Sequence, residues 1–158
     1  MGIMEKGKGI RFIADDMVGK LAKWLRILGY DVLYYRSIAN DELVRKAKDE
    51  ERVLLTKDTK LRDAKDVNCI FVKDDDYLEQ LDQVMEELKL EVDDDKIFSR
   101  CLICNGLLED ISKKDVEGKV PPFVYETREK FSFCRNCNKI YWQATHTDRV
   151  LQRLKRFK

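Results

Sequence analysis

Apolar residues follow two different periods along the first 95 positions of the chain. Short, mostly apolar runs predict four buried strands, at residues 10–14, 32–35, 53–56 and 69–72. Apolar residues three or four positions apart predict helices at residues 18–28, 40–51 and 76–90. Strands that alternate with helices form βαβ units. The pattern therefore predicts an α/β fold with a parallel sheet flanked by helices.

The rest of the chain has a less regular pattern and the opposite charge. Residues 1–95 carry 17 Lys and Arg against 23 Asp and Glu, a net charge of −6, whereas residues 96–158 carry 14 against 7, a net charge of +7. The acidic stretch at residues 91–95 lies at this change of sign. We therefore expect an α/β domain over residues 10–95 and a small module over residues 96–158, which ends in a basic amphipathic helix.

The overall composition is that of a globular protein with a highly charged surface. Of the 158 residues, 44% are hydrophobic and 39% are charged, and the charged share exceeds the roughly 25% of an average soluble protein. No apolar run reaches the roughly 18 to 20 residues that a membrane-spanning helix needs, which argues against a membrane partner. The Gly- and Lys-rich residues 1–9 lack the apolar segment of a signal peptide, so we expect a cytoplasmic protein.

Acidic residues follow all four predicted strands. Because the carboxyl ends of parallel strands meet at one edge of a sheet, we expect these carboxylates to converge. Converging carboxylates repel one another unless a cation lies among them, and Mg²⁺ or Mn²⁺ prefers such oxygen ligands. Ions of this kind can activate a water for phosphodiester hydrolysis. The acids are Asp15 and Asp16 after the first strand, Asp41 and Glu42 beyond the second, Asp58 after the third, and Asp74, Asp75 and Asp76 after the fourth.

The same acids also have a simpler interpretation as helix caps. Asp and Asn accept hydrogen bonds from the first N–H groups of a helix, and acids suit its first turn because of the helix dipole. Asp16, Asn40, Asp41, Glu42 and Asp76 each fit that role. Caps need not converge, however, and the same feature at four strand ends favours a site.

Basic residues accompany these acids. Lys20, Lys23 and Arg26 recur at intervals of three along the first predicted helix, and Lys57 precedes Asp58. Cations beside a carboxylate cluster suit a polyanionic substrate held against the site. Each single lysine also fits a solvated helix face.

Four of the five cysteines form two CxxC pairs. Cys101 and Cys104 make the first pair, and Cys134 and Cys137 make the second. Two such pairs hold a tetrahedral zinc ion, so we expect a structural Zn²⁺ site. The alternative is a redox dithiol at one of the pairs. Cys69 opens the fourth strand and is expected to be a buried structural thiol.

Three residues near the cysteines carry further expectations. Gly106 follows the first pair and Asn138 the second, and both residue types tolerate the positive φ that a tight knuckle requires. His146 is the only histidine. Because four thiolates fill a zinc site, we expect His146 at the surface or against a partner, with a catalytic role as the alternative.

The cysteine segment is also rich in aromatic and basic residues. A surface of this composition binds single-stranded nucleic acid through stacking and phosphate contacts. We expect two or three of the five aromatic residues to form the small core of the module instead. The residues are Tyr125, Phe131, Phe133, Tyr141 and Trp142, interleaved with Arg128, Lys130, Arg135 and Lys139.

Five sequence motifs together extend from about Arg11 to about His146. They are FIADDMVGKLAKWLRILGYDV, VLLTKD, RCLICNGLL, VPPFVYET and FCRNCNKIYWQATH. They resemble the Mut7-C domain, a PIN-like ribonuclease domain fused to a C-terminal zinc ribbon. The resemblance implies a PIN-type fold and a divalent-metal-dependent nuclease that acts on RNA.

The resemblance also assigns roles to single residues. Asp15 matches the acid after the first strand, and Asp58 matches the acid of the TxD turn, with Thr56 orienting it. Members of the family carry acidic residues at the start of a helix, and that helix start falls at residues 40–42 here. Asn40 replaces an acid at this point.

The other two acids follow from the same comparison. Asp41 or Glu42 would supply the second acid, and the fourth falls within residues 74–76, with Asp74 as its first candidate.

The sequence thus predicts a Mg²⁺- or Mn²⁺-dependent ribonuclease whose RNA backbone is positioned by Lys20, Lys23, Arg26 and Lys57. Two other functions fit the same residues. One is a non-catalytic RNA-binding module of an RNA-processing or ribosome-associated complex. The other is a toxin-like or regulatory protein that a protein partner holds inactive.

Overall fold

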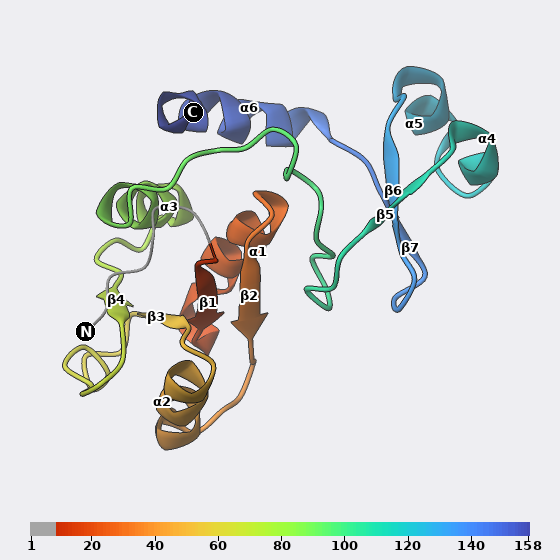
Figure 1. Ribbon diagram of the computed structural model, residues 1–158. Coiled ribbons are helices and arrows are strands. Elements are labelled where there is room, and N and C mark those ends of the chain that lie inside the picture. Colours follow the sequence, from red (N-terminus) through yellow and green to blue (C-terminus); the bar gives the residue numbers. More distant parts are fainter. Residues whose placement is uncertain (1–8) are drawn as a thin grey trace.

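The computed structural model describes residues 9–158, and Figure 1 shows their arrangement. Residues 1–8, which hold most of the segment examined for a signal peptide, lie outside the described residues. None of the helices in the described part combines the length and the apolar surface needed to span a bilayer. The first elements are β1 (Arg11–Ala14), η1 (Asp16–Val18), α1 (Gly19–Ile27), β2 (Asp31–Tyr34), α2 (Asn40–Asp49), β3 (Val53–Thr56), β4 (Cys69–Phe71) and α3 (Tyr77–Glu87). They are followed by β5 (Glu109–Ile111), α4 (Lys113–Val116), α5 (Pro122–Thr127), β6 (Phe131–Cys134), β7 (Lys139–Tyr141), α6 (Thr145–Arg153) and η2 (Leu154–Phe157).

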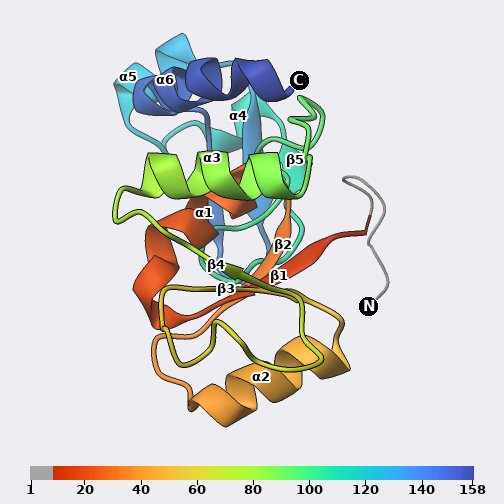
Figure 2. The ribbon, with the colours of Figure 1, turned by 90° about the vertical axis from the view of Figure 1, so that its left-hand side faces the viewer.

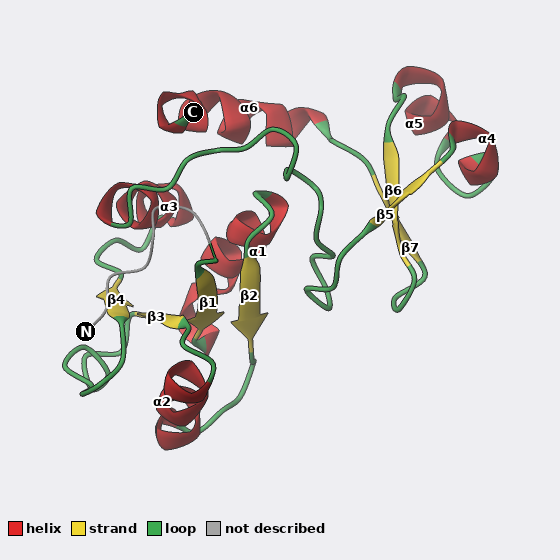
Figure 3. Cartoon of the chain, in the orientation of Figure 1, coloured by secondary structure: helices red, strands yellow, loops and turns green. Residues whose placement is uncertain are grey.

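The four predicted strands form one sheet, in the order β2-β1-β3-β4. All neighbouring pairs are parallel, and Phe12 of β1 lies opposite Val32 of β2 and Val53 of β3. Helices α1 and α3 cover one face of this sheet and α2 covers the other (Figures 1 and 3). The predicted α/β fold, with a parallel sheet flanked by helices, is therefore confirmed.

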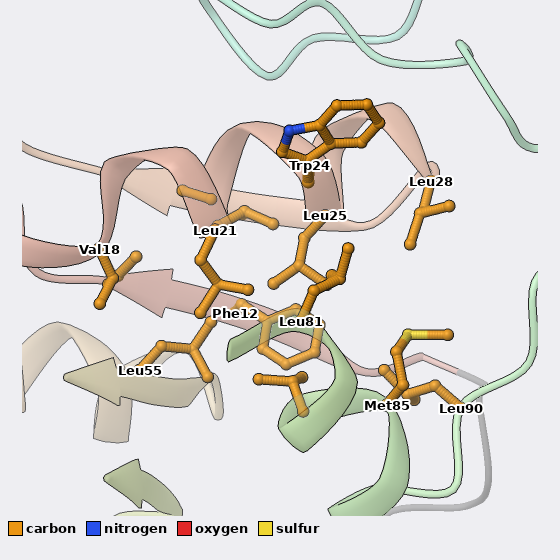
Figure 4. Close-up of a cluster of buried hydrophobic side chains, with 14 of the residues drawn as sticks. Phe12, Val18, Leu21, Trp24, Leu25, Leu28, Leu55, Leu81, Met85 and Leu90 are labelled. Carbon is orange, nitrogen blue, oxygen red and sulfur yellow. The ribbon is translucent and has the colours of Figure 1, made fainter. Parts of the chain in front are cut away.

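The side chains between α1, α3 and the sheet form the main hydrophobic cluster (Figure 4). Phe12 of β1, Leu25 of α1 and Leu81 of α3 are fully buried there. The next residue of β1, Ile13, belongs instead to the cluster of Leu43 on the α2 side of the sheet. Because successive strand residues serve two covered faces, the strands are apolar throughout rather than alternating.

Gly29 ends α1 in a conformation that other residues rarely adopt. Its φ is +98°, and a Cβ at this position would lie 2.5 Å from the main-chain oxygen of Lys96. The N–H groups of Gly29 and Tyr30 donate to the carbonyls of Arg26 and Leu25. Glycine is therefore required both by the helix end and by the close approach of the segment that leads to the cysteines.

The second sheet is antiparallel, with the order β5-β6-β7, and α4 and α5 lie between its first two strands in sequence. Phe131 and Tyr141 are buried in this part, which we call the ribbon (residues 99–143). Tyr125, Phe133 and Trp142 are half-buried. Two buried aromatic residues agree with the expectation that two or three would form its core.

Helix α6 returns from the ribbon to the main core, where it lies above α3 (Figures 1 and 2). Val150 and Leu154 are buried in the same cluster as Phe12. The N–H of Val92 also donates to the carbonyl of Phe157, at 2.9 Å. The charge pattern grouped this helix with the ribbon, whereas its packing groups it with the α/β domain. The boundary at residue 95 stays a prediction about folding units.

Acidic side chains of α3 pair with basic side chains of α6 and η2. Arg153 Nη2 lies 2.9 Å from a carboxylate oxygen of Glu79 and 2.8 Å from one of Asp82. Arg156 Nη2 lies 3.3 Å from Asp82 and 2.9 Å from Glu86. The opposite charges of the two halves of the sequence are therefore partly neutralised within the fold.

Replacing Leu154, the first residue of η2, tests the packing of the C-terminal helical segment on the main core. Because Leu154 is fully buried, we expect Leu154→Ala to lower the free energy of unfolding by about 2–5 kcal/mol. Urea unfolding should show the loss in the same transition that unfolds the parallel sheet. Lys155→Ala changes an exposed neighbour and should stay within about 0.5 kcal/mol of the wild type. A sheet transition that L154A leaves unchanged would contradict the shared core.

Candidate functional site

The carboxyl ends of β1 and β3 bring Asp15, Thr56 and Asp58 together. The N–H of Asp15 donates to the carbonyl of Leu55 at 3.1 Å, which ties the end of β1 to β3. The Thr56 side chain is fully buried, and its hydroxyl donates to Asp15 Oδ2. The same hydroxyl oxygen accepts the N–H of Asp58 at 3.0 Å. One buried hydroxyl therefore links two acids that follow different strands.

Asn40 also contributes to this edge of the sheet. It is the first residue of α2, and its amide Nδ2 donates to Asp58 Oδ2 at 3.2 Å. The N–H of Lys60 donates to the other carboxylate oxygen, Oδ1, at 2.9 Å. The expectation that Asn40 caps the helix is wrong, because Ala39 occupies the cap position without a side-chain bond. Asn40 instead orients Asp58.

The surroundings shift the pKa values of the two carboxyl groups in opposite directions. Burial raises the pKa of Asp15 above its ordinary value, against the lowering effect of the hydrogen bonds from Thr56 and Met17, and the charge of Asp58 raises it further. The hydrogen bonds from the Lys60 N–H and the Asn40 amide lower the pKa of Asp58. A cation between the two groups would relieve the cost of ionising Asp15.

The other predicted acids do not take part in this hydrogen-bond network. Asp41 and Glu42 are exposed in the first turn of α2, where Glu42 lies 3.8 Å from Arg45. Asp74 Oδ1 accepts the N–H of Asp76 at 2.8 Å, and Asp76 caps α3. Among the described residues, the hydrogen bonds around Asp15 and Asp58 include none of Asp41, Glu42 and Asp74.

The acidic edge is an open donor set rather than a closed cage. Within residues 9–158, groups of three or more possible metal ligands within 4.8 Å of one another occur only at the cysteines. Mg²⁺ keeps several waters and is commonly bound by one or two carboxylates together with substrate phosphates. The carboxylates of Asp15 and Asp58 fit that kind of binding, since both are hard oxygen donors.

The four predicted basic contacts divide into two kinds. Lys20 and Lys23 are exposed on α1. Lys57 Nζ lies 2.7 Å from a carboxylate oxygen of Asp75 and donates to the carbonyl of Asp74 at 3.2 Å, so it joins the loops after β3 and β4. This engagement makes Lys57 a structural link rather than a free cation.

Arg26 does not face the acidic edge, and we remove it from the expected substrate contacts. It is buried, and its guanidinium donates to the carbonyl of Val32 at 2.7 and 2.9 Å. The same group donates to the carbonyl of Leu102, beside the first cysteine, at 2.9 Å. Burial of the cation is compensated by these bonds, which tie α1 to both β2 and the ribbon.

Asn105 reinforces this joint from the ribbon side. Its Oδ1 accepts the N–H of Val32 at 3.0 Å, and its Nδ2 donates to Asp31 Oδ1 at 2.7 Å. Burial opposes ionisation of Asp31, but hydrogen bonds from Arg52 and Asn105 hold its pKa below the ordinary value. The free edge of β2 is therefore closed by side chains of the first helix and of the cysteine segment.

The four cysteines form a site with the dimensions of a zinc centre. The Sγ atoms of Cys101 and Cys137 are 3.8 Å apart, and those of Cys104 and Cys134 are 3.6 Å apart. A tetrahedron with Zn–S bonds of about 2.3 Å has edges of about 3.8 Å. The cysteines can therefore hold a structural metal such as zinc.

Neighbouring groups favour the thiolate form of Cys101, which is the form that binds a metal. Burial opposes its ionisation, but the Tyr141 hydroxyl, 3.1 Å away, and main-chain N–H groups lower the pKa of Cys101 to about 6. In contrast, Cys69 is half-buried rather than fully buried, and its burial raises the pKa of Cys69 to about 11, which agrees with a structural thiol. Asn105 and Asn138, directly after the two pairs, have positive φ. The expectation of positive φ at Gly106 is wrong, because Asn105 makes that turn.

The comparison with known families covers both the parallel sheet and the cysteine segment. Residues 10–154 match the Mut7-C RNAse domain. The chain belongs to the Mut7-C RNase domain family. A comparison with curated proteins finds no match. Membership of the Mut7-C family indicates a ribonuclease-like function and an RNA substrate.

Sequence reasoning missed two asparagines of this Mut7-C chain. The cap interpretation does not predict that the Asn40 amide holds Asp58. The expectation at Gly106 overlooks Asn105, although an asparagine follows both CxxC pairs. That repeated CxxCN pattern was the available signal for the turn. The bond from Asn105 to β2 has no such signal, since it joins residues 73 positions apart.

Replacing Asp15 by asparagine should stabilise the metal-free protein at neutral pH. Since burial raises the pKa of Asp15 in the folded state, ionisation favours the unfolded state. The contribution of the Asp15 carboxyl to folding stability is therefore fully present below its pKa in the unfolded state. That contribution is lost as pH rises through its pKa in the folded state. We expect Tm of Asp15→Asn to exceed that of the wild type at pH 7, with a gap that closes on acidification. A gap independent of pH would contradict this account.

Replacing Asn105 tests the joint between the cysteine segment and the sheet. Asn105→Ala leaves the buried N–H of Val32 without its acceptor, and we expect a loss of about 1–3 kcal/mol in unfolding free energy. Hydrogen exchange at the Val32 amide should accelerate. Asn138→Ala is the matched control, because Asn138 also has positive φ after a CxxC pair but is exposed. Equal effects of the two variants would mean that turn strain, not the joint, sets the loss.

Proposed function

We propose that this protein is a divalent-metal-dependent ribonuclease that hydrolyses RNA phosphodiester bonds at the edge formed by Asp15 and Asp58. The observation that supports it best is the buried Thr56 hydroxyl, which links the two acids from neighbouring strands. This arrangement occurs in a chain of a ribonuclease family. Family membership alone leaves the metal dependence and the residues open, and the linked acids are the reason for proposing both.

Each residue at the edge has a distinct role in the proposal. Asp15 supplies a buried carboxylate whose ionised form is favoured by a nearby cation, and Asp58 supplies a carboxylate that is already held ionised. Thr56 and Asn40 keep the two groups in place. A Mg²⁺ or Mn²⁺ ion bound there would activate water and offset the developing negative charge.

The flanking acids are proposed as additional contributors. Asp41 and Glu42 lie in the first turn of α2, directly after Asn40, which contacts Asp58. Asp74 lies in the loop that Lys57 ties to the end of β3. These positions keep all three on segments that adjoin Asp15 and Asp58.

The substrate side of the proposal rests on Lys20 and Lys23. Both are exposed on α1, which begins just beyond Asp15, and α1 contains no acidic residue. Phosphate groups of RNA bind lysine ammonium groups with release of counterions. The two lysines would therefore hold the RNA backbone beside the acidic edge.

Substitution of the linked acids tests the proposed activity. We expect the double variant Asp15→Asn/Asp58→Asn to lose cleavage of mixed RNAs in Mn²⁺. The loss should exceed the roughly 10- to 100-fold that removal of a supporting residue costs, and Thr56→Val should fall within that range. Asp110→Asn changes an exposed acid of β5 and should cleave like the wild type.

The same experiment separates catalysis from RNA binding alone. Cleavage by the double variant at the wild-type rate would refute the assignment of Asp15 and Asp58. If the wild type binds RNA but never cleaves it with Mn²⁺ or Mg²⁺, the protein is the non-catalytic RNA-binding module instead. Activity that appears only after removal of a co-purified protein would indicate a toxin-like or regulatory protein that a protein partner holds inactive.

A further inference from the structure

A series of side-chain contacts runs from the start of α1 to the start of α6. The Lys20 ammonium lies 5.5 Å from the centre of the Tyr77 ring. That ring stacks on Trp24, with centroids 6.2 Å apart and planes at 13°. Trp24 in turn meets His146 edge to face, with centroids 5.7 Å apart. The contacts connect α1, α3 and α6 on one side of the molecule.

The series continues into the ribbon. Thr145, the residue before His146, accepts a hydrogen bond from Arg128 Nη2 at 3.3 Å. Arg128 directly follows α5. Figure 2 shows that α1, α3 and α6 all begin on the same side of the molecule, the side on which α5 lies. The acidic edge and the ribbon are therefore connected along one face.

Four residues on this face carry basic or imidazole side chains. Lys20, Lys23 and His146 are exposed, and Arg128 is half-buried. In the part of the chain that the structure describes, neither lysine has a carboxylate within ion-pair distance. By comparison, Arg153 at the end of α6 and Arg156 of η2 are paired with α3.

The acids on the adjoining turns are occupied by other partners. Asp76 caps the N-terminus of α3, and Glu79 pairs with Arg153. Asp148 accepts a hydrogen bond from the Gln143 amide. These interactions engage three acids near the face, and among residues 9–158 neither lysine forms an ion pair, so both can meet an external anion.

We propose that this face binds a single-stranded segment of RNA that extends from the acidic edge to the ribbon. We call it the α1–α6 track and define it by Lys20, Lys23, His146 and Arg128. This inference rests on the proposed function, because the acidic edge is where the track begins. The two lysines and Arg128 contact phosphates, and the exposed imidazole of His146 contacts an unpaired base, as aromatic side chains do in single-strand recognition.

The buried contacts beneath the track explain why it is ready for a ligand. Trp24 is only 3% exposed, so it serves as a support for Tyr77 and His146 rather than as a binding surface. Groups that are already held in place lose less conformational entropy when a ligand binds. The narrow line of cations along one helix also suits one strand, whereas duplex-binding domains contact successive grooves over roughly 16 base pairs.

Binding of RNA without catalysis tests the track. The probe is a fluorescein-labelled single-stranded RNA of mixed sequence, and the protein is the full chain loaded with zinc and freed of Mg²⁺ and Mn²⁺. We expect anisotropy titrations to show His146→Ala weakening binding about fivefold or more. Lys20→Ala and Lys23→Ala should each reduce the slope of log K against log salt by about 0.7.

Matched controls separate the track from general charge. Lys48→Ala on α2 and Lys155→Ala on η2 remove exposed lysines elsewhere and should bind like the wild type. His146→Phe retains an aromatic ring and should bind more tightly than His146→Ala. Thermal unfolding of each variant shows that it remains folded.

The outcomes distinguish the track from the proposed ribonuclease. Wild-type binding by all track variants, or tighter binding of a duplex of the same sequence, would overturn the track. RNA cleavage that depends on Asp15 and Asp58 would still support the proposed function in that case. Conversely, binding that is lost in the track variants, in a protein that never cleaves RNA, would support the track and refute the ribonuclease.

Discussion

The buried guanidinium of Arg26 is the interaction on which the assembly of this molecule depends. Arg26 is buried on α1, and its guanidinium donates both to the carbonyl of Val32 in β2 and to the carbonyl of Leu102, beside Cys101. A buried cation is costly unless each donor is used, so these bonds leave little freedom in how the ribbon meets the sheet. Asn105 completes the closure of the β2 edge. On the other edge, Gln83 of α3 does the same for β4, since it donates to the carbonyl of Phe71 and accepts the N–H of Lys73. Both exposed strand edges are thus closed by side chains.

The distribution of charge has a different meaning in the fold than in the sequence. The net charges of −6 and +7 suggest an acidic half for metal and a basic half for RNA. In the structure, much of the basic surplus near the C-terminus is paired with α3 and with Asp94. Those pairs lie above a buried seam that contains Val150 and Leu154, and exposed pairs of this kind contribute little compared with that burial. Within residues 9–158, Lys20 and Lys23 of α1 form no ion pair and can meet a polyanion, although Lys20 also lies over the Tyr77 ring.

The parts of the structure that the sequence predicts are those governed by local period. The four strands and the helices between them follow from apolar spacing, and the acids at strand ends follow from the geometry of parallel sheets. Contacts across long sequence separations were not predictable in this way. Arg26 lies at the same interval as Lys20 and Lys23, yet the arrival of Leu102, 76 positions later, buries it. Asn40 has the composition of a cap, and only the approach of the loop after β3 assigns its amide to Asp58. Periodicity places a side chain on a face, but it does not reveal what later covers that face.

The presence of Asn40 rather than an acid changes what the acidic edge can hold. A carboxylate at this position would face Asp58 with a like charge, whereas the amide donates a hydrogen bond to it and lowers its pKa. The edge therefore has two linked carboxylates and one neutral donor, so a divalent ion there would have its charge balanced but would still need further oxygen ligands. Such an ion would depend on a substrate phosphate to complete its ligands, as Mg²⁺ commonly does. Since Lys20 and Lys23 of α1 would attract the same phosphate backbone, binding of the metal and of the RNA would reinforce one another at this edge.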